Sequence, residues 1–230
     1  GYTDDRIILI VEDDIADNVS NPNKGVIQVT IGGNNVYENV EIDYRMSSLK
    51  AKDILAILNG EKSETLPTVI ESTENDNLFV FWSGHGVPGA MCWDEEPYAM
   101  TGDDLSTVFK DMNLKRRYRK LLMMVEACFS GGVMEQCEGI PGMLFITAAN
   151  GDETSKADVF NGEMKVWMSN RFTSTFIEQI TDNKDVAMRD LYYRLFINTV
   201  GSHVMVYNAE NYGNLYSANM SEFINFKNDK

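Results

Sequence analysis

Apolar and polar positions follow one another along the chain in blocks that predict a parallel β-sheet. Two uninterrupted apolar runs, residues 78–82 and 121–125, each stop at small or polar residues. Runs of this kind are typical of strands that are buried on both faces of a parallel sheet. Similar runs lie within residues 6–11, 142–149 and 204–207. We therefore predict that these five segments are strands.

Between these runs the apolar residues change to a helical period. Residues 49–58, 101–112, 171–180 and 186–199 place apolar side chains three or four positions apart, which favours helices that pack one face on a core. Helices that link strands by right-handed crossovers cover both faces of a sheet. The pattern predicts an α/β fold with a mostly parallel central sheet and helices on both faces.

Turn-forming residues dominate three other stretches. Residues 18–40 are rich in Asn and Gly and contain an alternating segment, 26–31, which predicts a surface excursion with a β-hairpin. Residues 61–76 are polar, so we expect a loop there, and residues 87–94 form a turn-rich segment. The pattern contains neither a repeat nor an interdomain linker, and we expect residues 1–230 to form a single domain.

Reactive side chains follow the two longest strand runs. His85 comes after the first run, in Ser83-Gly84-His85-Gly86, and Cys128 comes after the second. Ligands of parallel sheets bind beyond the carboxyl ends of the strands, so we expect both side chains at one site. Imidazole exchanges protons near neutral pH, and a thiolate is a strong nucleophile. The pair is typical of a cysteine hydrolase.

Each of these residues also has a purely structural interpretation. Free cysteine is among the most buried residue types, and histidine can serve as a hydrogen-bonded structural residue. The surroundings favour chemistry, because glycines flank His85 and Glu126 lies on the same face of its strand as Cys128. The amides of Gly86 and Cys128 are candidate oxyanion donors. His203 lacks such a setting, and we expect it to be structural.

Composition narrows the classes of partner. The chain has 35 acidic and 20 basic residues and a formal net charge of −15, and it carries no basic patch suited to a phosphate backbone, so we do not expect nucleic acid as a partner. No apolar run approaches the roughly 20 residues that span a bilayer, so we expect no membrane insertion. A zinc site from His85, Cys92, Cys128 and Cys137 is a rival interpretation, but the spacing of Cys128 and Cys137 fits no usual ligand pair.

Two motifs, Ser83-Gly84-His85-Gly86 and Glu126-Ala127-Cys128-Phe129-Ser130-Gly131, resemble the active-site motifs of the legumain family, peptidase family C13 of the caspase-like clan. The similarity extends to residues 13–16, 21–22, 36–40, 43–44, 118–120, 147–150 and 202–205. Residues 40–45 and 115–118 also resemble the related catalytic subunit of glycosylphosphatidylinositol transamidase. The resemblance covers most of the chain and implies a caspase-like α/β fold.

For function, the resemblance implies a cysteine endopeptidase that cleaves peptides or proteins after asparagine, and more weakly after aspartate, without a cofactor or metal. Glu126 would line the S1 pocket, together with a residue of the pair Thr154 and Ser155. Glu163 is the candidate for a further acid in that pocket. A carboxylate can accept a hydrogen bond from a side-chain amide, which fits the recognition of asparagine.

Two alternatives for the function stay open, and the resemblance departs at one point. An amine in place of water would make the chain a transpeptidase through the same acyl-enzyme, and a catalytically silent caspase-like binding module is the second alternative. The resemblance also implies that the chain begins after the family's first strand, which contributes an Arg to S1. We therefore expect an upstream segment of the same precursor, or another strand, to fill that position. The compartment implied is extracytoplasmic: secreted, periplasmic, lysosomal or vacuolar.

Overall fold

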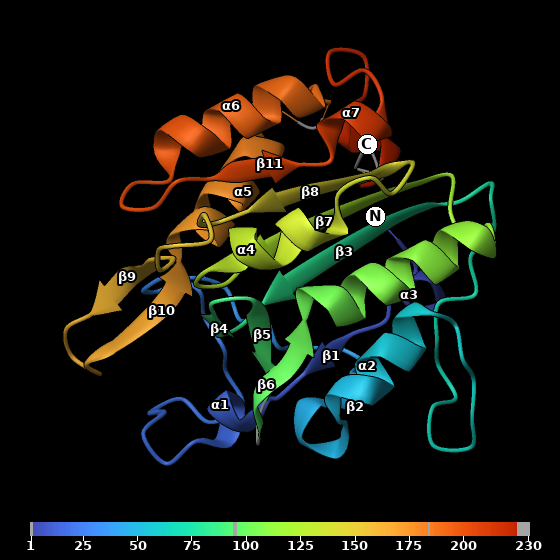
Figure 1. The fold of residues 1–230 in the computed structure, drawn as a ribbon. Coiled ribbons are helices and arrows are strands. Elements are labelled where there is room, and N and C mark those ends of the chain that lie inside the picture. The colour runs from blue at the N-terminus through green and yellow to red at the C-terminus, as the bar shows by residue number, and fades with distance from the viewer. Residues whose placement is uncertain (1, 94–95, 184, 225–230) are drawn as a thin grey trace.

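A computed structural model describes residues 2–93, 96–183 and 185–224 of the chain. Its centre is a four-stranded sheet in the order β11-β8-β7-β3. Strands β3 (Asn77–Ser83), β7 (Lys120–Glu126) and β8 (Met143–Thr147) run parallel, and β11 (Met205–Tyr207) is antiparallel to β8 at one edge (Figure 1). The predicted strands in these four places are confirmed.

Helices cover both faces of this sheet (Figure 1). On one face, α2 (Ala51–Leu58) and α3 (Gly102–Leu114) pack against Leu121, Met123 and Val125 of β7. On the other face, α5 (Arg171–Asp182) and α6 (Met188–Asn198) pack against Leu122 and Met124. Because strand side chains alternate between faces, a continuous apolar run supplies two cores at once. The predicted α/β fold is confirmed.

Helix α3 shows how the sequence sets an element boundary. Thr101 precedes its first residue, and the Thr101 hydroxyl accepts a hydrogen bond from the Asp104 N–H at 3.2 Å. The Asp104 carboxylate accepts one in return from the Thr101 N–H at 3.0 Å. This reciprocal capping satisfies two amide donors that would otherwise lack partners. The helix then buries Leu105, Phe109 and Met112.

Strand β3 is an edge of the central sheet. In the described part of the chain it pairs with β7 alone, while β1 (Ile10–Val11) and β2 (Tyr44–Arg45) form a separate parallel pair. Ile8 and Ile10 nevertheless pack against the same core as Leu78, Val80 and Trp82. The apolar side chains of β3 are only half-buried, and Phe81 is 37% exposed.

Two small antiparallel sheets lie beside the end of the central sheet to which β3 and β7 point (Figure 1). One sheet consists of β4 (Gly86–Val87), β5 (Ala90–Trp93) and β6 (Glu96–Thr101). The other is the hairpin of β9 (Ala157–Asn161) and β10 (Val166–Asn170). The segment expected to be turn-rich, residues 87–94, contains the turn at residues 88–89 between β4 and β5, and its residue 94 lies outside the described residues.

The predicted hairpin at residues 26–31 is wrong, since residues 18–40 are described throughout and contain no strand. The side-chain oxygen of Asn35 accepts hydrogen bonds from the Ile27 and Tyr37 amides at 3.0 and 3.1 Å. Together with the hydrogen bond from the Val36 N–H to the Ile27 carbonyl at 2.9 Å, these contacts close the segment without strand pairing. The predicted strand at residues 6–11 is confirmed only for Ile10–Val11.

Among the described residues, no helix is long and apolar enough to cross a membrane. Short elements complete this part of the chain. They are the α-helices α1 (Asp14–Asp17), α4 (Ser130–Met134) and α7 (Ala209–Tyr212) and the 3-10 helices Asp4–Arg6, Met46–Ser48, Glu135–Cys137 and Met220–Glu222.

Candidate active site

His85 and Cys128 follow the ends of two neighbouring parallel strands. The register pairs Ser83 with Glu126, and the Gly84 N–H extends the pairing by donating to the Glu126 carbonyl at 3.0 Å. Two such strands end at the same level, so the residues that follow them emerge on the same side of the sheet. His85 is exposed in the connection from β3 to β4, and Cys128 is partly buried.

Gly86 brings the segment that carries His85 against the segment that carries Cys128. A β-carbon at Gly86 would lie 2.0 Å from the carbonyl oxygen of Cys128 and 3.3 Å from the β-carbon of Ala127. No side chain fits such a gap, so this close approach of two backbones requires glycine. The residue after His85 is therefore in direct contact with Cys128.

A tight turn presents Cys128 between β7 and α4. Phe129 has φ 55° and ψ 17°, the left-handed region, which a bulky residue rarely adopts. Its N–H donates to the Glu153 carbonyl at 2.8 Å, and the Gly131 N–H donates to the Ala149 carbonyl at 3.1 Å. The loop that follows β8 thus holds the turn that carries the thiol.

The three cysteines differ in how far they are buried. Cys137 is fully buried beside α3, and burial raises the pKa of its thiol to about 12. A thiol in that state is an inert core residue. The structure does not gather the four residues of the rival zinc site: across the described residues, no three His, Cys, Asp or Glu side chains meet to hold a metal ion.

Glu126 places a carboxyl group beneath the thiol segment. Its side chain is 1% exposed, and Oε2 accepts hydrogen bonds from the N–H of Thr173 at 3.0 Å and from the hydroxyl of Thr173 at 3.1 Å. Oε1 is buried without a hydrogen-bond partner among the described residues. Burial raises the pKa of Glu126, and the hydrogen bonds from Thr173 oppose the rise. A buried oxygen left without a partner is suited to accept a donor from a ligand.

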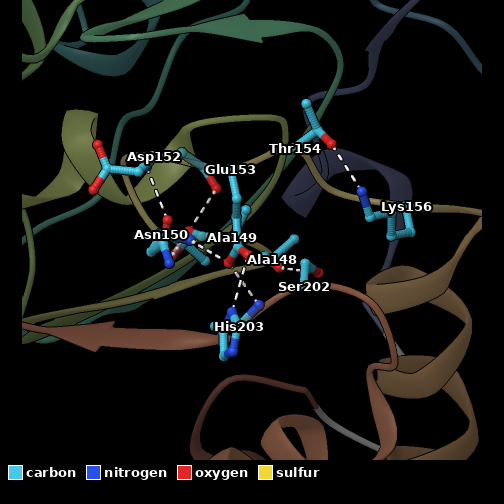
Figure 2. A network of polar contacts seen from close by, with 11 residues as sticks. Ala148, Ala149, Asn150, Asp152, Glu153, Thr154, Lys156, Ser202 and His203 are labelled. Atoms are coloured by element: carbon cyan, nitrogen blue, oxygen red, sulfur yellow. Dashed lines mark hydrogen bonds and ion pairs between the residues drawn. The ribbon is translucent and has the colours of Figure 1, made fainter.

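Thr154 and Ser155 point in different directions. The Ser155 hydroxyl lies 3.9 Å from the Cys128 sulfur, whereas exposed Thr154 accepts a hydrogen bond from the Lys156 ammonium at 2.9 Å (Figure 2). Glu163 is exposed in the turn between β9 and β10, where its N–H donates to Asn161. That hairpin extends away from the end of β7 (Figure 1). The structure therefore brings Ser155 to Cys128, and it brings neither Thr154 nor Glu163 there.

Comparison with known proteins assigns the chain to a family. The sequence model of the Peptidase C13 family matches residues 1–223. This chain belongs to the Peptidase C13 family. It is 29% identical to legumain from Rattus norvegicus over 214 residues, which are 90% of this chain and 48% of legumain. It is 35% identical to vacuolar-processing enzyme from Vicia sativa over 161 residues, 67% of this chain and 32% of that enzyme. The C13 chain thus spans half or less of the length of these relatives.

Sequence reasoning missed Thr173 in this C13 site. Thr173 lies in the first turn of α5, where amide donors have no partner within the helix and readily bind a carboxylate. The sequence held one signal for this residue: Thr173 lies near the start of residues 171–180, which were expected to form a helix. Glu126 at the end of β7 and Thr173 at the start of α5 are 47 residues apart in the sequence, so only the fold brings them together.

A second cluster of polar contacts joins His203 to the loop after β8 (Figure 2). The Glu153 carboxylate accepts the His203 N–H at 2.7 Å, contacts His203 Nδ1 at 2.9 Å and accepts the Asn150 N–H at 3.2 Å. The neighbouring Ser202 hydroxyl donates to the Ala148 carbonyl at 2.7 Å. These contacts tie the start of β11 to the loop that holds the Cys128 turn.

Proposed function

We propose that this chain is a cysteine endopeptidase that cleaves peptide or protein substrates after asparagine, and more weakly after aspartate. Cys128 is the nucleophile, and His85 is the acid and base. The observation that carries the proposal is the contact of Gly86 with the Cys128 carbonyl, where the segments that follow β3 and β7 meet. Membership of the Peptidase C13 family supports the same chemistry.

The reaction proceeds through a thioester. The Cys128 sulfur bonds to the scissile carbonyl carbon, and its proton passes to His85. The amides of Gly86 and Cys128 stabilise the negative oxygen that forms. The carbon–nitrogen bond then breaks, and His85 returns the proton to the leaving amine. Water bonds to the thioester carbon, the carbon–sulfur bond breaks, and a proton returns to the thiol.

Glu126 and Ser155 form the pocket for the residue before the cleaved bond. The unpartnered Glu126 Oε1 accepts a hydrogen bond from the side-chain amide of asparagine, whether or not the carboxyl is protonated. Where Glu126 is ionised, an ionised aspartate meets like-charge repulsion in the same place, because the buried site screens charge weakly. This difference supports the stated preference for asparagine over aspartate.

The experiment compares variants on an asparaginyl peptide. Cys128→Ala and His85→Ala should each lower kcat/KM by about 1,000-fold or more, whereas Cys92→Ala, a second partly buried cysteine, should stay near the parent rate. Gly86→Ala should lower kcat by about 100-fold, because the turn must shift to admit the methyl group. Gly162→Ala is its matched control, since an added β-carbon there meets nothing within 4 Å. Unchanged hydrolysis by Cys128→Ala would refute the proposal.

We propose one structural partner and one compartment. The partner is an extended upstream segment of the precursor that pairs with the edge of β3 left unpaired among the described residues, and the half-buried apolar side chains of that strand support it. Slower amide exchange of β3 in a longer form of the protein would support this pairing, and unchanged exchange would contradict it. The compartment is extracytoplasmic, supported by the name of the vacuolar-processing enzymes; fractionation of the source cells tests it.

A further inference from the structure

Glu153 connects three segments around the nucleophile, and we call this group the Glu153 clamp: Glu153, His203, Asn150 and Phe129. The backbone carbonyl of Glu153 accepts the Phe129 N–H at 2.8 Å. Its carboxylate holds the His203 N–H at 2.7 Å, His203 Nδ1 at 2.9 Å and the Asn150 N–H at 3.2 Å (Figure 2). One residue therefore links the turn after Cys128 to the start of β11.

The Phe129 end of the clamp controls how the thiol is presented. Phe129 directly follows Cys128 and has a left-handed backbone, which a phenylalanine keeps only where surrounding contacts impose it. The hydrogen bond from its N–H to Glu153 is one of those contacts. Ser155, two positions after Glu153, lies 3.9 Å from the Cys128 sulfur. A shift of Glu153 would therefore move both the turn and the hydroxyl beside the thiol.

The His203 end of the clamp lies near the surface. The side chains of His203 and Glu153 are 67% and 24% exposed, so removing the imidazole opens no cavity in the core. Burial alone would raise the pKa of Glu153, but hydrogen bonds from His203 and Asn150 outweigh it and hold the pKa below its usual value. The clamp therefore favours the ionised carboxylate, and its negative charge strengthens each hydrogen bond that the carboxylate accepts.

We propose that His203 is a positioning residue: through Glu153 it fixes the turn at Phe129 and so sets the orientation of the Cys128 thiol. The proposal rests on the proposed function and assigns a role to a histidine that touches neither Cys128 nor the pocket carboxyl Glu126 in the described contacts. It predicts an effect on the chemical step that is separate from substrate affinity.

The experiment uses a variant pair at His203. His203→Ala removes the side-chain hydrogen bond, whereas in His203→Asn the amide nitrogen can occupy the place of Nδ1 and keep it. We expect His203→Ala to lower kcat by about 10-fold or more with KM changed by about 2-fold or less, and His203→Asn to recover most of the loss. Glu210→Gln, a change at an exposed glutamate on α7, should match the parent.

A second readout keeps this proposal distinct from the proposed function. The rate at which iodoacetamide alkylates Cys128, followed by peptide mapping, should fall in His203→Ala and recover in His203→Asn even if no peptide is hydrolysed. If His203→Ala does not fold, Glu153→Gln replaces it: this variant keeps an acceptor oxygen, loses the charge, and should slow alkylation. Equal alkylation and equal kcat in the parent and the variants would overturn the proposal, as would equal damage by Ala and Asn.

Discussion

Strands β7 and β3 lie side by side in the same sheet, but they differ in burial and in pairing. Cys128 follows the first strand and His85 follows the second. The side chains of β7 from Leu121 to Glu126 are fully buried, and the strand is paired on both sides. Those of β3 are partly buried or exposed, and in the described structure its pairing is limited to β7. Cys128, the proposed nucleophile, therefore follows a strand at the centre of the sheet, and His85 follows a strand at its edge.

The contrast continues in the loops beyond the strands. The Cys128 turn is held by hydrogen bonds from Phe129 to Glu153 and from Gly131 to Ala149. His85 is exposed, and its carbonyl accepts the Cys92 N–H at 2.9 Å, a link to β5 in a small neighbouring sheet. The comparison indicates that the thiol is preorganised and that the histidine is the more adjustable partner.

Amide hydrogen exchange should show the largest difference between the strands. The Gly84 N–H donates to β7, so by the alternation of a parallel ladder the amides of Phe79 and Phe81 point away from β7. We expect these two amides to exchange about 1,000-fold or more faster than those of Met123 and Met124, which are released only by global unfolding. Equal protection in the 230-residue chain would show that another segment covers the edge.

Core truncation at register partners should give the next largest difference. Leu78 and Leu121 pair across β3 and β7 and contribute to the same core, but Leu121 is fully buried and Leu78 is not. Leu121→Ala should lower the free energy of unfolding by about 2–5 kcal/mol, and Leu78→Ala by about 1–2 kcal/mol. Urea denaturation measures both values. Equal losses would mean that β3 is as firmly packed as β7.

A substitution at Glu126, which pairs with Ser83 at the end of the register, should give the smallest change in stability. Burial raises the pKa of Glu126 in the folded chain, so the folded state binds its proton more tightly than the unfolded state. The resulting stability is fully present below the unfolded pKa, about 4.3, and is lost as pH rises through the folded pKa. Relative to the parent, Glu126→Gln should therefore become more stable as pH rises through that window. Urea denaturation across pH tests this, and a constant difference would contradict it.

Sequence predicted the central strands and the main helices, because long apolar runs and helical periods depend on local residue order. It also placed His85 and Cys128 directly after two of these strands, which are neighbours in the sheet. It did not predict β4 to β6 or the β9–β10 hairpin, whose short strands alternate with Gly, Pro and polar residues and depend on contacts with the rest of the fold. The pocket shows the same limit. Ser155 and Thr154 are neighbours in sequence, and only the loop geometry separates the one that approaches the thiol from the one that binds Lys156.

The edge of β3 that no described segment pairs lies beside His85, the proposed acid and base, and it also links the stability of the protein to the concentration of any chain that binds there. Any extended chain that binds the edge of β3 in the folded state alone stabilises that state by mass action, by about 2.7 kcal/mol when its free concentration is 100 times its dissociation constant. Exposed apolar edges also recruit further copies of a chain when no such ligand is present. The melting temperature of this protein should therefore depend on which extended chains are present in the solution. Because His85 lies two residues beyond the end of β3, binding of such a chain should affect His85 directly.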